Sequence, residues 1–287
     1  MSASRRAFAF GLALAAVSCR ARERKSRAVR IVSTIPSTTE ALFAIGAGAL
    51  VVGRSRYCDY PPAALALPAI GGFADPSLEA ILALAPTLVV GGRGPAGAAW
   101  VEKLAARGIA TYFPPADAMA DVDAMIVGLG ARTAHVAEAD AVVARIRARR
   151  AAVSESVAGL PRPRVLFVFG VTPIVVAGPG TFADEMIRLA GGTNVISGAG
   201  PAWPTIDLEK VLALDPDIVL DASMEEHHQQ GSEHLGAPWN AVRAVRERHV
   251  VALGDEVVLR PGPRVGEGLA QVARALHPNA IVPPESP

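Results

Sequence analysis

Short apolar runs rich in β-branched residues alternate along the chain with longer stretches of helical pattern. The first run begins at Val29 and leads through Pro36-Ser37-Thr38-Thr39-Glu40 into an apolar helix that ends near Gly46. Strands are predicted at residues 29–32, 88–90, 109–113 and 165–169. Because strands that alternate with helices build layered folds, the pattern predicts the α/β class.

An internal repeat is the most informative feature of this pattern. Residues 77–90 read SLEAILALAPTLVV and residues 207–220 read DLEKVLALDPDIVL, with seven identities in fourteen positions at an offset of 130. Each unit predicts an N-cap, a short helix, a proline-marked turn and a strand. The caps and prolines are Ser77, Asp207, Pro86 and Pro216.

The repeat implies two similar α/β lobes. The predicted boundaries are 29–118 for the N-terminal lobe, 119–163 for a connecting helical segment, 164–279 for the C-terminal lobe and 280–287 for a tail. A weaker similarity, between residues 40–46 and 185–191, pairs two helices that end at glycine, and chance is a fair explanation of that pair. Two lobes joined by a stiff connection leave a cleft between them, and interfaces between domains are favoured ligand sites.

The connecting segment is almost entirely helix-forming between residues 121 and 158. Gly128 and Gly130 are expected to interrupt the helix, and Thr133 is a candidate cap for its second part. Two prolines then end it before the next strand. A long backbone helix, rather than a flexible Gly/Ser linker, is therefore predicted to join the lobes.

The first residues have the order of an export signal. Arg5 and Arg6 precede an apolar run, residues 7–17, that is too short to span a bilayer as a stable anchor. Cys19 follows, and it resembles the lipidated cysteine of a bacterial lipobox. The two arginines also resemble a twin-arginine signal, so the export route stays open. We expect a signal peptide at residues 1–18, a tether at 19–28, and an extracytoplasmic lipoprotein anchored through Cys19.

Composition and charge narrow the class of function. The chain has 287 residues and a formal net charge of +1, so it lacks the basic footprint of nucleic-acid-binding proteins. Its two cysteines, Cys19 and Cys58, exclude a disulfide framework. The sequence contains no G-x-S-x-G elbow, no Walker A loop and no H-E-x-x-H helix, and Gly178-Pro179-Gly180-Thr181 is predicted to be a turn. A binding protein is therefore favoured over an enzyme.

One polar tract contains side chains that suit a divalent metal. Glu225-Glu226-His227-His228, with Glu233 and His234 nearby, offers imidazoles and carboxylates. The tract also contains two glutamines and a glycine and is polar throughout, which favours a solvated loop. No metal site is predicted.

The scarce aromatic residues lie near turns. Tyr57 and Tyr60 belong to the proline-ended stretch SRYCDYPP, residues 55–62, which cannot be regular helix. Phe73 precedes the first repeat unit, and Trp203 precedes the second. Packing against the core is the alternative for each ring. Because loops before equivalent helices both face the cleft, Phe73 and Trp203 are predicted to contact a ligand there, and Tyr57 adds a third ring from the first lobe.

Together these features resemble one protein family. The stretch SRYCDYPP, the two L-E-x-x-L-A-L-x-P units, residues 167–170 (FVFG), Trp203-Pro204 and residues 260–264 (RPGPR) are similar to the cobalamin branch of the helical-backbone, class III, periplasmic binding proteins. The resemblance covers essentially the whole mature chain in the right order. It implies a monomeric, non-enzymatic component of an ABC importer, with cobalamin or a related corrinoid as the transported ligand. That ligand passes from the inter-lobe cleft to a permease homodimer with its ATPase subunits.

The resemblance also assigns roles to individual residues. The positions that line the family's cleft are Ser37, Tyr57, Phe73, Phe169, Trp203, Asp255 and Arg260. Glu79 and Glu209 stand where the family's glutamates meet arginines of the two permease subunits, although each also suits the positive end of a helix dipole. Gly92 stands where the best-known cobalamin binders have tryptophan, so a wider pocket is expected.

Other ligand classes stay open. Branches of the same family bind ferric siderophores or haem, and many siderophores are anionic, so arginines in the candidate cleft loops suit them. These arginines are Arg54, Arg56, Arg93 and Arg260. Metal-binding proteins share the two-lobed fold, but only the His227 tract offers ligands for a metal. A corrin is a broad plate fringed with neutral amides that aromatic faces hold well, so cobalamin is preferred.

Overall fold

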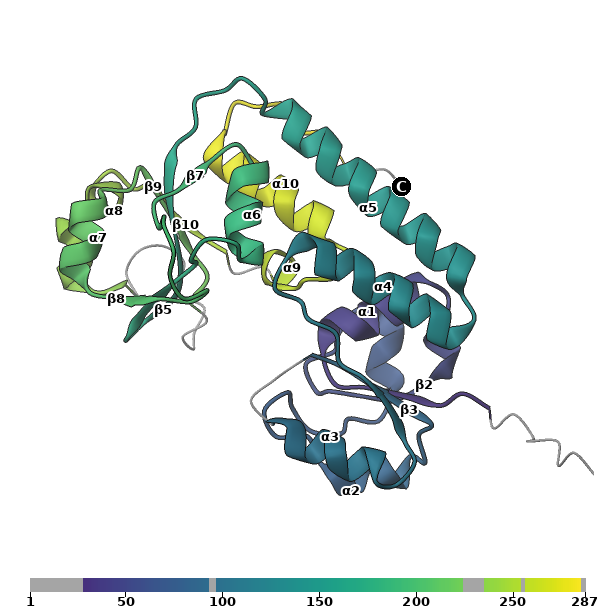
Figure 1. Ribbon diagram of the computed structural model, residues 1–287. Coiled ribbons are helices and arrows are strands. Elements are labelled where there is room, and N and C mark those ends of the chain that lie inside the picture. The colour runs from purple at the N-terminus through teal and green to yellow at the C-terminus, as the bar shows by residue number, and fades with distance from the viewer. Residues whose placement is uncertain (1–27, 93–96, 224–234, 254–255, 285–287) are drawn as a thin grey trace, which may run out of the picture.

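Two α/β lobes are joined by a layer of helices. The structure, a computed structural model, describes residues 28–92, 97–223, 235–253 and 256–284. Helix α5 (Val136–Ser156) runs along the outer side of the helical layer, and the two sheets lie on the other side of it (Figure 1). The predicted α/β class and two-lobed architecture are confirmed.

Four short parallel strands form the sheet of the N-terminal lobe, in the order β2-β1-β3-β4. They are β1 (Ile31–Ser33), β2 (Val51–Arg54), β3 (Leu88–Val90) and β4 (Ala110–Tyr112). The helices are α1 (Pro36–Ala44), α2 (Leu78–Ala83) and α3 (Gly97–Ala105), with 3-10 turns at Gly48–Leu50 and Pro62–Ala66. The sequence predicts β1, β3 and β4 to within two residues. It misses β2, whose interior glycine weakens the strand signal.

The C-terminal lobe has a mixed sheet in the order β10-β9-β5-β6-β8, with β7 paired to β5. Its strands are β5 (Arg164–Val171), β6 (Ile174–Val176), β7 (Thr193–Asn194), β8 (Thr205–Ile206), β9 (Ile218–Asp221) and β10 (Val250–Ala252). Strands β6 and β8 are antiparallel extensions of an otherwise parallel sheet. The helices are α6 (Phe182–Leu189), α7 (Leu208–Leu214), α8 (Arg243–Arg246), α9 (Glu256–Leu259) and α10 (Val265–Leu276), with a 3-10 helix at Ala237–Ala241.

Helix α4 (Met119–Thr133) passes straight through Gly128 and Gly130, so the expected interruption there is wrong. Both glycines allow close packing instead. A methyl group at Gly128 would collide with the hydroxyl of Tyr112, and one at Gly130 would lie 2.5 Å from Cβ of Ala139 on α5. The helix tolerates the low helix propensity of both glycines because these contacts have room only for a small residue.

The chain turns between the two connecting helices at Ala134, which has a left-handed φ of 60°. Helix α5 begins after His135, which caps it without a side-chain hydrogen bond. Thr133 is not the predicted cap of α5, because its hydroxyl donates to the carbonyl oxygen of Leu129 at 2.9 Å. The connection is therefore a pair of packed helices, α4 and α5, rather than one.

One hydrophobic core extends through both lobes and the helical layer. Successive strand residues point to opposite faces of a sheet, and in both lobes one set faces the helical layer. This set joins buried residues of α4, α5 and α10 in a single cluster, and it includes Ile31, Leu88, Val90, Val165 and Phe167. The other set lies over α2 and α3 or over α7 and α8, and it includes Val32, Val89, Leu166, Val168 and Val219. Because the lobes share their central core, the connection between them is stiff.

Both similarities within the chain are present in the fold. Ser77 and Asp207 each accept a hydrogen bond from the backbone N–H three residues further on, at 3.2 and 2.7 Å, which confirms both N-caps. The weaker similarity pairs α1 with α6. Each of these helices is followed by a glycine with left-handed φ, 81° at Gly46 and 82° at Gly191.

The predicted signal peptide and almost all of the predicted tether, residues 1–27, lie outside the described part of the chain. Among the residues that are described, no helix is both long and apolar enough to cross a bilayer. At the other end, Val282 is buried in the shared core, and the carbonyl oxygen of Pro284 accepts a hydrogen bond from Arg149 at 2.9 Å. The start of the predicted tail is therefore packed against α5.

Candidate ligand-binding site

The tyrosine loop, residues 55–62, leaves β2 at the carboxyl end of the N-terminal sheet. The N–H of Ser55 donates to a carbonyl oxygen of β1 at 2.9 Å, and that of Cys58 donates back to Ser55 at 3.0 Å. Cys58 is fully buried, and burial raises the pKa of its thiol. Tyr57 and Tyr60 are 53% and 44% exposed. The loop is anchored through Cys58 and displays both rings, so neither tyrosine belongs to the core.

Phe73 lies beside the carboxyl end of β3 and is also exposed. A methyl group placed on Gly92 would lie 3.9 Å from Cε2 of Phe73 and 3.0 Å from Cδ1 of Ile35. The extra width that the resemblance implies at Gly92 is therefore partly taken up by these two side chains.

Trp203 projects from the antiparallel edge of the C-terminal sheet, just before β8. Its ring meets Phe169 edge-on at 4.6 Å, and Phe169 stacks on the buried ring of Phe167 at 4.7 Å. The N–H of Gly178 donates to the carbonyl oxygen of Ala202, the residue before Trp203, at 2.8 Å. A methyl group on Gly178 would lie only 2.5 Å from a neighbouring carbonyl oxygen, so this close approach requires glycine. Trp203, 44% exposed, therefore stands on a fixed backbone and a rigid aromatic stack.

A cluster of charged residues joins the two lobes, and we call Glu40, Asp59, Arg260 and Arg264 the inter-lobe cluster. Glu40 lies on α1, and its side chain is only 2% exposed. Arg264 binds it with two parallel bonds of 2.8 Å, from Nε to Oε2 and from Nη2 to Oε1. Arg260 adds a third bond from Nη1 to Oε1 at 3.2 Å. A buried carboxylate needs such partners, because burial of an unpaired charge is very costly.

The same two arginines hold the tyrosine loop. Arg260 donates from Nη1 to Oδ1 of Asp59 at 2.8 Å and from Nη2 to the carbonyl oxygen of Tyr57 at 3.4 Å. The guanidinium of Arg264 lies 4.0 Å from the ring centroid of Tyr60. Partial burial raises the pKa of Asp59, but the hydrogen bond and charge of Arg260 outweigh it and hold this pKa below its usual range.

The other described arginines near the loops are also engaged within the protein. Arg54 donates from Nε to the carbonyl oxygen of Ala64 at 2.9 Å and from Nη1 to that of Ser55 at 3.0 Å. Arg56 forms an ion pair with Asp75 at 2.7 Å, and its hydrogen bond lowers the pKa of that carboxyl. Arg93 lies outside the described residues.

The predicted ligand contacts therefore differ in how they are placed. The rings of Tyr57, Phe73 and Trp203 are exposed, and Phe169 supports Trp203. Ser37 is buried and lies close to Gly262, since a methyl group added to that glycine would lie 3.4 Å from Cα of Ser37. Arg260 forms ion pairs, and Asp255 lies outside the described residues.

Sequence reasoning missed three members of the inter-lobe cluster. Glu40 interrupts an apolar helix, and a charged residue on a buried face is the signal that points to it. Its partner Arg264 lies in RPGPR and Asp59 lies in the tyrosine loop, but neither stretch shows by itself that these residues pair.

The two predicted docking residues occupy equivalent exposed places. Glu79 lies in the first turn of α2 and Glu209 in the first turn of α7. These helices lie at the ends of the two lobes that are far from α5 (Figure 1). Cys19, the predicted lipid attachment site, lies outside the described residues.

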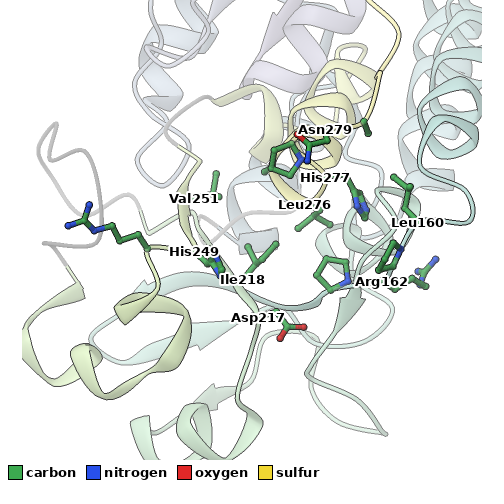
Figure 2. Close-up of a pocket in the computed structure, with 15 residues that line it drawn as sticks. Leu160, Arg162, Asp217, Ile218, His249, Val251, Leu276, His277 and Asn279 are labelled. Carbon is green, nitrogen blue, oxygen red and sulfur yellow. The ribbon is translucent and has the colours of Figure 1, made fainter.

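A separate cavity of about 790 Å³ lies in the C-terminal lobe at the amino ends of β5, β9 and β10 (Figure 2). It is lined by residues such as Leu160, Ile218 and Leu276 and contains none of the predicted contacts. Two of its polar residues are engaged in other contacts. Asp217 pairs with Arg243 at 2.8 Å, and Arg162 donates to the carbonyl oxygen of Gly192. Ligands of α/β sheets bind at the carboxyl ends of strands, so this cavity does not mark the site.

No group of three or more possible metal ligands lies together among residues 28–92, 97–223, 235–253 and 256–284. The His227 tract lies outside these ranges.

Known proteins are similar to this chain in sequence and in fold. A family model for periplasmic binding proteins matches residues 31–257. The chain belongs to the periplasmic binding protein family. It is therefore a binding component of a transport system outside the cytoplasm and not an enzyme, as the sequence predicts.

Individual relatives cover nearly the whole chain. The vitamin B12-binding protein of Photorhabdus laumondii is 27% identical over 252 residues, which are 88% of this chain and 89% of the relative. The haem-binding protein RhuT of Roseiflexus sp. RS-1, in apo form, has a TM-score of 0.78 at 29% identity and covers 88% of this chain and 99% of its own. The vitamin B12-binding protein BtuF of Vibrio cholerae has a TM-score of 0.72 at 26% identity and covers 86% and 96%. The class III resemblance is confirmed.

Proposed function

We propose that the protein binds cobalamin or a related corrinoid between its lobes, one molecule per monomer, and delivers it to an ABC permease. Relatives that bind vitamin B12 cover most of the chain, which supports this ligand class. The proposed contacts are Ser37, Tyr57, Phe73, Phe169, Trp203, Asp255 and Arg260. Because the lobes share one core, little hinge motion is expected on binding.

The observation that carries the proposal is the contrast between exposed rings and engaged arginines. Tyr57 in one lobe and Trp203 in the other offer aromatic faces to solvent. Arg56 and Arg260 already face carboxylates of the protein. A corrin plate with neutral amide side chains uses the rings and needs few charges, whereas an anionic siderophore needs guanidinium groups that are available.

Haem is the second candidate, because the haem-binding protein RhuT is a close structural neighbour. Haem is also a planar ligand, and a tyrosine oxygen is a known ligand of haem iron. Tyr57 is exposed and positioned in a loop, as that role requires. The two carboxylates of haem distinguish it from a corrin, because they also need cationic partners.

Titration of the purified protein with cobalamin, cobinamide, haem and a ferric siderophore tests the proposal. We expect one corrinoid per monomer with at least about tenfold higher affinity than haem, a difference of about 1.4 kcal/mol. Stronger binding of haem, with an absorbance change typical of iron ligation, would replace cobalamin by haem. Binding of the siderophore alone would overturn both.

We propose that a lipid on Cys19 anchors the protein to the membrane. Glu79 and Glu209 are proposed to contact the two subunits of a permease homodimer, which works with its ATPase subunits. If Cys19 carries lipid, the wild-type protein fractionates with membranes and Cys19→Ser releases it to the soluble exported fraction. Wild-type protein that is wholly soluble after export would show that the signal is an ordinary cleaved one.

A further inference from the structure

We infer that Glu40 is a positioning residue, which holds the tyrosine loop in its ligand-binding conformation from across the lobe boundary. The inference deepens the proposed function, since it concerns how Tyr57 is presented to a ligand. Glu40 acts through the two arginines of the C-terminal lobe, which bind its carboxylate.

The tyrosine loop depends on these arginines at three points. Arg260 binds the carbonyl oxygen of Tyr57 and the carboxylate of Asp59, and Arg264 covers the ring of Tyr60. Both arginines come from the chain between α9 and α10, far from the loop in sequence. The loop of one lobe is thus held by side chains of the other.

Glu40 fixes the place of both guanidinium groups. Arg264 uses its fork, Nε and Nη2, on the two oxygens of Glu40, a geometry that sets the plane of the guanidinium as well as its position. Arg260 divides its Nη1 contacts between Glu40 and Asp59. Asp59 is half exposed, whereas Glu40 is buried, so Glu40 is the less screened partner of the two arginines.

Glu185 provides a matched control within the same chain. It occupies in α6 the place that Glu40 occupies in α1, because each glutamate lies six residues before a left-handed glycine, Gly191 or Gly46. Glu185 also reaches out of its lobe, because its Oε2 accepts a hydrogen bond from the N–H of Met119 at 2.6 Å. Its hydrogen bond and ion pair are with Met119 and Arg188, outside the tyrosine loop, so its loss tests the joining of helices without the positioning of that loop.

Cys58 reports on the loop without any ligand. Cys58 is next to Tyr57 and Asp59 in sequence and is fully buried, so alkylation of its thiol requires the loop to open. In a full-length Cys19→Ser background Cys58 is the one remaining thiol. We expect Glu40→Gln to speed its alkylation by iodoacetamide at least tenfold, and Glu185→Gln to change it less than threefold. Urea unfolding of each variant checks that labelling is measured on folded protein. Equal rates in the two variants would overturn the inference.

A second measurement links Glu40 to the tyrosine. For cobalamin binding by calorimetry, we expect Glu40→Gln to weaken affinity at least tenfold in the wild-type background. In a Tyr57→Ala background the same change is expected to cost less than threefold, because the ring that Glu40 positions is already absent. Full additivity of the two losses would make Glu40 a general structural residue and overturn its positioning role.

A milder variant covers the case in which Glu40→Gln does not fold. Asp59→Asn breaks only the exposed end of the cluster, and we expect it to speed alkylation of Cys58 about threefold. Unchanged labelling in that variant would contradict the inference. If the wild-type protein binds no cobalamin, the proposed ligand fails, and the alkylation rates still decide whether Glu40 holds the loop.

Discussion

The two repeat units, one in each lobe, use the same hydrogen bonds at the same places. In the N-terminal lobe the N–H of Arg30 donates to Oγ1 of Thr87 at 2.9 Å, and its Nη2 donates to the carbonyl oxygen of Leu84 at 2.8 Å. In the C-terminal lobe the N–H of Arg164 donates to Oδ2 of Asp217 at 2.8 Å, and its Nη2 donates to the carbonyl oxygen of Leu214 at 2.7 Å. An arginine at the start of a strand thus caps the end of the repeat helix in both lobes.

The parts of the lobes that carry the candidate contacts do not correspond in this way. The N-terminal lobe displays Tyr57 from a loop after a parallel strand, and the C-terminal lobe displays Trp203 at an antiparallel edge. Symmetry is therefore kept around Glu79 and Glu209, where two equivalent permease subunits are expected. It is lost where one asymmetric ligand is expected. The comparison separates the proposed docking face from the proposed ligand face.

Loss of both docking glutamates is the largest effect that this comparison predicts. We expect Glu79→Ala with Glu209→Ala to reduce uptake and permease binding about tenfold or more, with unchanged ligand affinity, because paired rim charges set orientation and encounter rate. Each single variant should lose a similar part of uptake and of permease binding. Uptake of labelled ligand and binding to the permease in vesicles measure the loss.

Glu138 is the control for this prediction, since it is an exposed glutamate in the first turn of α5, away from both repeat units. Glu138→Ala removes a similar helix-dipole interaction and is expected to leave uptake unchanged. Normal transport by the double variant at moderate ionic strength would leave the two glutamates with the helix-dipole role alone.

The ligand face gives the next largest effect. We expect Trp203→Ala to weaken ligand binding at least about tenfold, since loss of an aromatic anchor at a binding centre commonly costs 2 kcal/mol or more. Trp203→Phe keeps a ring against Phe169 and should lose less. Calorimetry on folded variants measures both. Unchanged affinity in Trp203→Ala would remove this residue from the site and leave the C-terminal lobe without its main contact.

The smallest expected effect comes from substituting the strained residue that ends each repeat helix. Ala85 and Asp215 occupy the same left-handed place before the repeat proline, with φ of 46° and 41°. We expect Ala85→Gly to stabilise the protein by about 0.5–1 kcal/mol, because relief of strain exceeds the added entropy of the unfolded chain. Urea unfolding measures the change.

The equivalent substitution in the other lobe sharpens this test. Asp215→Gly should gain less, because aspartate tolerates the left-handed region better and its carboxylate pairs with Arg243 at 2.9 Å. Equal stabilisation by both substitutions would mean that the ion pair contributes nothing and that the two sites are equivalent.

Periodicity and repetition were enough to predict the lobes, three strands of the first sheet and both N-caps. They failed at Gly128 and Gly130, because the contacts that require these glycines come from Tyr112 and from a neighbouring helix. The tyrosine loop was recognisable from its own residues. Its support was not, since Glu40 and Arg260 are separated by 220 residues and no local pattern pairs them. Charges that meet across lobes depend on the whole fold.

The shared hydrophobic cluster makes the two lobes inseparable parts of one cooperative unit. A lobe cut out at residues 118 or 164 would expose the strand residues that now face α4, α5 and α10, such as Val90 or Phe167. Recombination of lobes between relatives therefore requires that the helical layer be carried along and that its apolar faces match both sheets. New binding specificities are easier to engineer by exchanging the tyrosine loop and the Trp203 edge, which lie outside this cluster.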